Sequence, residues 1–134
     1  MQYYLDTNIL AFLLTNKDSI SRKVENILSN YENVLLTSSV CVMELIHLFQ
    51  IGKLRKRNFD VSFVLDKIAE FNITIKSVQE QHLQTMSELQ FFQDHTDPND
   101  RLIISQAITD KIPLISSDRK FSKYQDLKFV FNER

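Results

Sequence analysis

The sequence predicts an α/β fold in which helices flank a mostly parallel sheet. Short apolar runs typical of strands alternate with longer runs of helical periodicity, which is the pattern of such folds. The composition, 43% hydrophobic and 25% charged, is that of an ordinary globular protein. A chain of 134 residues can bury one core, so we expect a single domain over residues 1–134.

The first half of the chain contains two strand-like and four helix-like runs. Residues 3–5 are apolar and aromatic, which predicts a short buried strand. Ile20, Val24 and Ile27 recur at helical spacing, and Gly52 is placed to end a strongly apolar helix. In chain order the predicted elements are a strand over 3–5, helices over 8–14 and 19–30, a strand over 34–36, and helices over 39–50 and 59–71.

The second half adds three strands, which brings the predicted sheet to five. Pro98 stands where proline is favoured, in the first turn of a helix. The predicted elements are strands over 73–75, 113–115 and 128–131, helices over 80–92 and 98–109, and a short turn or helix over 119–124.

Single residues exclude several classes of protein. Gly52 is the only glycine, whereas phosphate-binding loops of NTPases and dinucleotide fingerprints need two or three at fixed spacing. Cys41 is the only cysteine and lies in an apolar stretch, so we expect it to pack in the core rather than bind zinc. No apolar run approaches the ~20 residues of a membrane span and no signal peptide opens the chain, which indicates a cytoplasmic protein.

Four acidic residues occupy positions that this fold gathers at one end of the sheet. Asp6 and Asp118 each follow a predicted strand, and parallel sheets bind ligands beyond the carboxyl ends of their strands. Capping of the next helix or turn explains either residue equally well. Glu44 lies on the helix over 39–50. The alternative explanation for it is an ordinary polar residue on the solvent-exposed face of an amphipathic helix.

Asp100 is the most informative of the four. Asp97 and Pro98 are typical of a helix start, with Asp97 as the N-cap. Asp100 then lies in the first turn, in line with the apolar stripe that includes Ile103 and Ile104. A carboxylate on a buried face needs a partner, which favours a functional role, with Asp97 as an outer assistant.

Carboxylates brought together repel one another, and a bound hard divalent cation relieves this repulsion. The sequence therefore predicts a metal site formed by Asp6, Glu44, Asp100 and Asp118. We expect Mg²⁺ as the ion, with Mn²⁺ as the alternative.

Four stretches of the chain resemble the PIN-domain ribonucleases, in particular the VapC-like toxins of type II toxin–antitoxin systems. They occur in the order of that family and extend over nearly the whole chain: Leu5-Asp6-Thr7-Asn8-Ile9-Leu10, Ser38-Ser39-Val40-Cys41-Val42-Met43-Glu44-Leu45, the segment from His95 to Ala107 with its Asp-Pro-Asn-Asp-Arg core, and Leu114-Ile115-Ser116-Ser117-Asp118. One departure is Asn99, where close relatives often carry an aromatic residue.

The resemblance implies a PIN-like three-layer fold, with a five-stranded, mostly parallel sheet between helices. It also implies that the four acids are catalytic and metal-binding, with hydrogen-bonding support from Asn8 or Ser117. The implied reaction is metal-dependent hydrolysis of RNA by a homodimer that a cognate antitoxin inhibits. The open alternative is a PIN-like module that binds RNA or a protein without cutting, although such a module would be expected to lose site acids.

An acidic site repels RNA, so basic residues around it must supply attraction. With a net charge of −1 the protein as a whole does not attract RNA, so local clusters of basic residues must supply the attraction. The candidates are Lys53, Arg55, Lys56 and Arg57 in one cluster and Arg119, Lys120 and Lys123 in another.

Overall fold

A computed structural model describes residues 1–54 and 60–133 of the chain. Five strands in these residues form one sheet in the order β3-β2-β1-β4-β5. Their bounds are Gln2–Leu5 (β1), Val34–Ser38 (β2), Ile73–Lys76 (β3), Leu114–Ser116 (β4) and Phe129–Phe131 (β5). Every pairing between these strands is parallel, so the predicted five-stranded α/β sheet is confirmed.

Strand β1 lies at the centre of the sheet. Its Leu5 is in register with Thr37 of β2 and Ile115 of β4, and both Tyr4 and Leu5 are buried. Because the strands are parallel, the residues that follow β1, β2 and β4 emerge at the same edge of the sheet. That edge is where the sequence analysis places Asp6 and Asp118.

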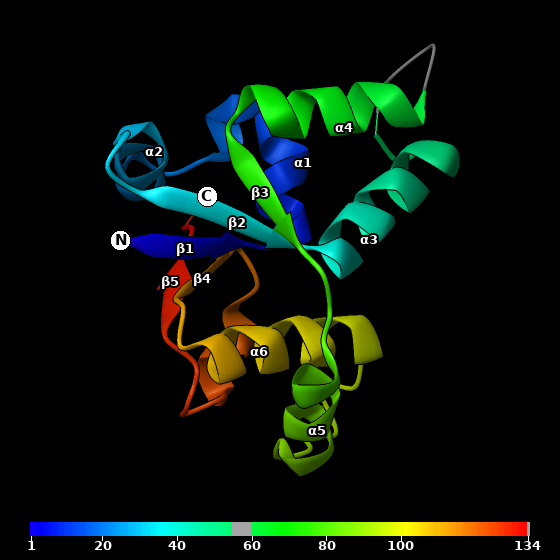
Figure 1. Cartoon of the computed structure of the whole chain (residues 1–134), viewed down its shortest axis with the longest axis vertical. Helices are drawn as coiled ribbons and strands as arrows, with labels where there is room; N and C mark the ends of the chain where they lie inside the picture. Colours follow the sequence, from blue (N-terminus) through cyan, green and yellow to red (C-terminus); the bar gives the residue numbers. More distant parts are fainter. Residues whose placement is uncertain (55–59, 134) are drawn as a thin grey trace.

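Helices cover both faces of the sheet, as the three-layer prediction requires. Figure 1 shows α5 and α6 on one side of the strands and α1, α2 and α4 on the other. The bounds of the α-helices are Thr7–Thr15 (α1), Arg22–Ser29 (α2), Ser39–Gln50 (α3), Val61–Glu70 (α4), Glu80–Glu88 (α5) and Pro98–Asp110 (α6). Two 3₁₀ helices, Lys17–Ser19 (η1) and Arg119–Lys123 (η2), complete the described secondary structure.

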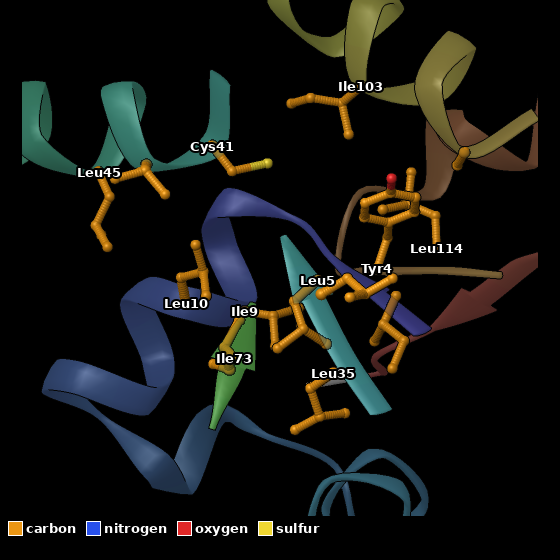
Figure 2. Close-up of a cluster of buried hydrophobic side chains, with 14 of the residues drawn as sticks. Tyr4, Leu5, Ile9, Leu10, Leu35, Cys41, Leu45, Ile73, Ile103 and Leu114 are labelled. Atoms are coloured by element: carbon orange, nitrogen blue, oxygen red, sulfur yellow. The ribbon is translucent and has the colours of Figure 1, made fainter. Parts of the chain in front are cut away.

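The hydrophobic core extends from both faces of the central strands. Figure 2 shows Ile103 of α6 on one side of these strands and Ile9 with Ile73 on the other. Cys41 is fully buried in the same cluster and forms no disulfide, which confirms its predicted packing role. None of the described helices is long and apolar enough to cross a membrane.

Most predicted helix boundaries are confirmed within two residues, and α3 matches its prediction at both ends. Gly52 ends α3 as expected: it has φ +76° and donates its N–H to the carbonyl of Phe49 at 3.1 Å. The predicted start of the next helix, Phe59, lies outside the described residues. The described helix, α4, begins at Val61 with Asp60 as its N-cap.

Two helix boundaries differ from their predictions. Helix α2 begins at Arg22 rather than at residue 19, because the Ser21 hydroxyl accepts the N–H of Val24 at 3.2 Å and caps it. Helix α5 ends at Glu88 rather than at residue 92. Leu89 is extended, with φ −67° and ψ 133°, so the helix stops there, and the buried Arg101 donates to the carbonyls of Leu89 and Gln90 at 3.2 and 2.9 Å.

Candidate metal centre

The carboxylate of Asp6 is buried at the junction of β1 and α1. It is 3% exposed, and its Oδ1 accepts the N–H of Thr7 at 2.8 Å, which caps α1. Its Oδ2 accepts the Ser116 hydroxyl at 2.6 Å and the Asn8 side-chain amide at 3.2 Å. Asp6 is therefore both an N-cap and a rigidly held carboxylate at the sheet edge, so the two readings of this residue are compatible.

Glu44 reaches the same region from α3 and is held by two elements. Thr7 donates its hydroxyl to Oε1 at 2.6 Å, and Asn99 donates its amide to Oε2 at 3.3 Å. The side chain is half-buried. Because Glu44 is held by hydrogen bonds from two other elements, it is not simply a residue on the solvent-exposed face of the helix.

Asp100 lies in the first turn of α6, as predicted. Asp97 caps this helix by accepting the N–H of Asn99 at 2.8 Å, and Pro98 is the first helical residue. Asp100 is half-buried, and its Oδ2 lies 3.3 Å from Nε2 of His95. A carboxylate in line with an apolar stripe needs a partner, and for Asp100 this partner is His95, which lies on the segment before α6.

Asp118 follows β4 and caps η2, where its Oδ1 accepts the N–H of Lys120 at 2.9 Å. Its own N–H donates to the Ser116 hydroxyl at 3.1 Å, so one serine connects Asp118 to Asp6. The four predicted acids thus come from four separate segments.

These four acids meet in one open pocket of about 820 Å³. The rest of its wall comes mainly from the exposed and half-buried side of α3. The pocket is lined by Asp6, Thr7, Asn8, Met43, Glu44, Ile46, His47, Leu48, Gln50, Asn99, Asp100 and Asp118.

Two of the acids resist ionisation in the protein alone. Burial raises the pKa of Asp100 to about 8, and the negative charges of Asp6 and Asp97 add to this effect. Burial also raises the pKa of Asp6 to about 6, although its hydrogen bonds from Ser116 and Thr7 oppose the shift. A bound cation would favour the charged form of both carboxyls.

The donor set fits a divalent metal. Ligand atoms of Glu44, Asp97 and Asp100 lie within 4.8 Å of one another, as do those of His95, Asp100 and Asp118. Asp100 belongs to both groups, whereas Asp6 belongs to neither and lines the same pocket. Oxygen donors predominate, which suits Mg²⁺ or Mn²⁺ better than softer metals.

Sequence reasoning missed several polar residues of this site. Asn99 and His95 each contact one of the four acids, and Thr7 and Ser116 each contact two. Of the predicted supporting residues, Asn8 does reach Asp6. Ser117 holds Asn8 through its backbone N–H, which donates to Oδ1 of Asn8 at 3.1 Å, whereas its hydroxyl accepts the side-chain amide of Asn132 at 2.8 Å. Successive strand residues point to opposite faces, and this alternation could have separated Ser116 from Ser117 in the sequence.

The adjacent serines provide a matched test of this geometry. We expect Ser116→Ala to weaken Mn²⁺ binding by roughly 10-fold, because Asp6 and Asp118 lose a shared hydrogen-bond partner. Ser117→Ala should leave the affinity near that of the wild type. Isothermal titration calorimetry measures both, and equal effects of the two substitutions would contradict the assignment.

The predicted cations differ in their surroundings. Lys53 and Arg119 are exposed, and the Arg119 guanidinium lies 4.7 Å from the ring centroid of Phe131. Lys120 donates its ammonium to the carbonyl of Asp94 at 3.0 Å, and Lys123 pairs with the Asp94 carboxylate. Arg55, Lys56 and Arg57 lie outside the described residues.

Comparison with known proteins identifies a family over nearly the whole chain. The family model described as PIN domain matches residues 3–127. No curated protein matches the sequence.

Solved structures with the same fold come from bacterial complexes. A chain of VapBC2 from Rickettsia felis, bound to a DNA fragment from its promoter, is 23% identical with a TM-score of 0.73, over 98% of this chain and 99% of that one. A chain of VapBC-1 from nontypeable Haemophilus influenzae is 22% identical, with a TM-score of 0.71 and full coverage of both chains. A chain of DNA-bound VapBC from Salmonella typhimurium is 15% identical with a TM-score of 0.69, over 98% of each chain. At these identities the similarity concerns the fold.

Proposed function

The chain belongs to the PIN domain family, and from this premise we propose that it is a metal-dependent ribonuclease, the toxin of a type II toxin–antitoxin pair. One observation carries the proposal: acids from four separate segments line a single open pocket. A pocket of this kind suits an ion that must also reach a large polyanionic substrate.

The chemistry of the proposed reaction divides between the ion and the protein. A bound Mg²⁺ or Mn²⁺ lowers the pKa of a coordinated water and stabilises negative charge on the phosphate. In the proposal Asp6 and Asp100 would hold the ion, and Asp118 would complete the site. Glu44 would either ligate the ion or accept a proton from the attacking water, in both cases through Oε2, because its Oε1 is bound more closely by Thr7.

Attraction of RNA to this acidic pocket requires nearby positive charge. Arg119 directly follows Asp118, and its guanidinium stacks on Phe131, which pairs with Ser116 in the sheet. Stacking leaves the N–H donors at the edge of the guanidinium able to reach phosphate oxygens. We propose that Arg119 contacts RNA, whereas the contact of Lys120 with Asp94 holds its ammonium away.

This difference between adjacent cations gives a second matched test. Arg119→Ala is expected to reduce kcat/KM for RNA cleavage by roughly 10-fold at low salt, and Lys120→Ala by much less. The difference should shrink as salt screens the charges. An equal loss in both variants would contradict the specific role of Arg119.

The proposal includes partners and location. We propose that a cognate antitoxin covers the acidic pocket and that the toxin forms a homodimer. Val61 and Leu65 are apolar residues exposed on α4, and we propose that this helix contributes to one of these surfaces. We also propose that the protein acts in the cytoplasm, where RNA is available as a substrate.

The direct test is cleavage of RNA by the purified protein. We expect cleavage with Mg²⁺ or Mn²⁺, none with EDTA, and recovery when excess metal is restored. Binding of RNA without cleavage at any metal concentration would instead favour a non-catalytic PIN-like module. Cleavage that persists in EDTA would contradict the metal-dependent proposal.

A further inference from the structure

A buried histidine stands behind the metal-site carboxylate of Asp100. His95 is 4% exposed, and its Nε2 faces Oδ2 of Asp100 at 3.3 Å. Its other nitrogen, Nδ1, lies 2.6 Å from the hydroxyl of Tyr124. The imidazole therefore connects the carboxylate to a residue that does not line the pocket.

The ring of His95 is held on several sides. Its centroid lies 5.5 Å from the centroids of both Phe121 and Tyr124, and its backbone N–H donates to the carbonyl of Phe92 at 3.1 Å. A neutral imidazole carries one N–H, and its position decides whether Nε2 acts as a hydrogen-bond donor or a metal ligand.

The partners of the two ring nitrogens determine that position. An ionised carboxylate can only accept, so Nε2 must donate to Asp100 when that side chain is charged. Nδ1 then carries no hydrogen and accepts the hydroxyl of Tyr124. With Nδ1 accepting, the single N–H of the ring is on Nε2 and points to Asp100.

We propose that His95 is a positioning residue that donates its Nε2–H to Asp100, at the end of a hydrogen-bond chain that begins at Tyr124. This inference rests on the proposed metal-dependent function, since it concerns how Asp100 is presented to the ion. A carboxylate fixed through one oxygen keeps the other available as a ligand, and its orientation is set before the ion arrives. His95 thus acts through Asp100 and does not coordinate the ion.

The alternative is direct coordination. Ligand atoms of His95, Asp100 and Asp118 lie within 4.8 Å of one another, so Nε2 could reach an ion if it carried a lone pair. The two roles differ in the tautomer of the metal-free protein and in the nitrogen coupling of the metal-bound one. They also differ in the expected effect of His95→Gln on metal affinity, because glutamine keeps an N–H donor but has no imidazole.

His82 provides a control at the opposite end of α6. It is 3% exposed, and its Nε2 lies 2.9 Å from Oδ1 of Asp110, so it forms the same kind of buried pair. Neither His82 nor Asp110 lines the acidic pocket. Its replacement should affect stability as that of His95 does, without the effect on metal binding.

The first experiment uses the wild-type protein and needs no substitution. Long-range ¹H–¹⁵N correlation spectra of ¹⁵N-histidine-labelled, metal-free protein, recorded near pH 9 so that Asp100 is ionised, report the tautomer of each ring, with the His95 signals assigned by their loss in His95→Gln. We expect the N–H of His95 on Nε2. An N–H on Nδ1 would overturn the proposal. Because this readout involves neither metal nor RNA, it remains decisive even if the wild type binds no metal, a result that would refute the proposed function separately.

The second experiment measures Mn²⁺ affinity by calorimetry. We expect His95→Phe to bind Mn²⁺ roughly 10-fold or more weakly, His95→Gln to recover most of the affinity through its amide donor, and His82→Phe to bind as the wild type does. Electron spin-echo spectra of the Mn²⁺-loaded wild type should lack the coupling of a directly bound nitrogen. Wild-type affinity in His95→Phe, or equal losses in His95→Phe and His95→Gln together with nitrogen coupling, would overturn the proposal.

Discussion

Asp100→Asn is expected to reduce metal-dependent RNA cleavage by roughly 100-fold or more, and at the same time to raise the melting temperature of the metal-free protein. The loss follows because Asp100 belongs to both groups of potential metal ligands. The gain follows because burial and neighbouring acids disfavour the charge of Asp100, as its pKa of about 8 indicates. Activity assays and calorimetric unfolding measure the two effects.

The combination of effects is more diagnostic than either alone. Asp6→Asn should also abolish cleavage while preserving the fold, since an Asn side chain keeps an oxygen that can accept the Thr7 N–H and cap α1. Asp66→Asn, an exposed change on α4, serves as the control and should alter neither quantity. Full activity in the Asp6 or Asp100 variant would remove that residue from the mechanism.

Stabilisation of the protein by Mg²⁺ is expected to be larger near pH 8 than near pH 5. In the metal-free protein the pKa values of Asp6 and Asp100 are raised from 3.8 to about 6 and about 8. An unfolded chain releases these protons near pH 4, so between about pH 4 and pH 8 the folded chain holds more protons. The contribution of these groups to stability therefore falls as pH rises through this window.

A bound metal ion replaces the protons on Asp6 and Asp100, so their contribution to stability is no longer lost as pH rises. Binding releases more protons near pH 5, so the proton competes with the ion there and competes little near pH 8. Differential scanning calorimetry with and without millimolar Mg²⁺ at the two pH values measures the difference. Asp100→Asn should remove most of it. A larger Mg²⁺ effect at the acidic pH would contradict the assignment of the raised pKa values to the metal site.

The sequence was sufficient to predict the five strands of the sheet, because each strand is a short apolar run that can be recognised from its own residues. It was also sufficient to predict that Asp6 and Asp118 lie at the same edge of the sheet, since residues that follow parallel strands meet there. Asp100 was detectable because a carboxylate in line with an apolar stripe conflicts with helix amphipathicity. In each case the information lies within a few residues of the position concerned.

The supporting contacts could not be found in this way because their partners are distant in sequence. Thr7 and Glu44 are 37 residues apart, and Asp6 and Ser116 are 110 apart. Local periodicity carries no information on such pairs. The contacts of Arg101 are another example, since its guanidinium donates to carbonyls 11 and 12 residues before it.

Anomalous diffraction from a crystal soaked in Mn²⁺ tests the central claim most directly. We predict a manganese peak in the acidic pocket within about 2.5 Å of a carboxylate oxygen of Asp100, with Asp6, Glu44 or Asp118 completing the coordination directly or through water. A pocket without manganese at a concentration that supports cleavage, or an ion bound only elsewhere on the protein, would contradict the account.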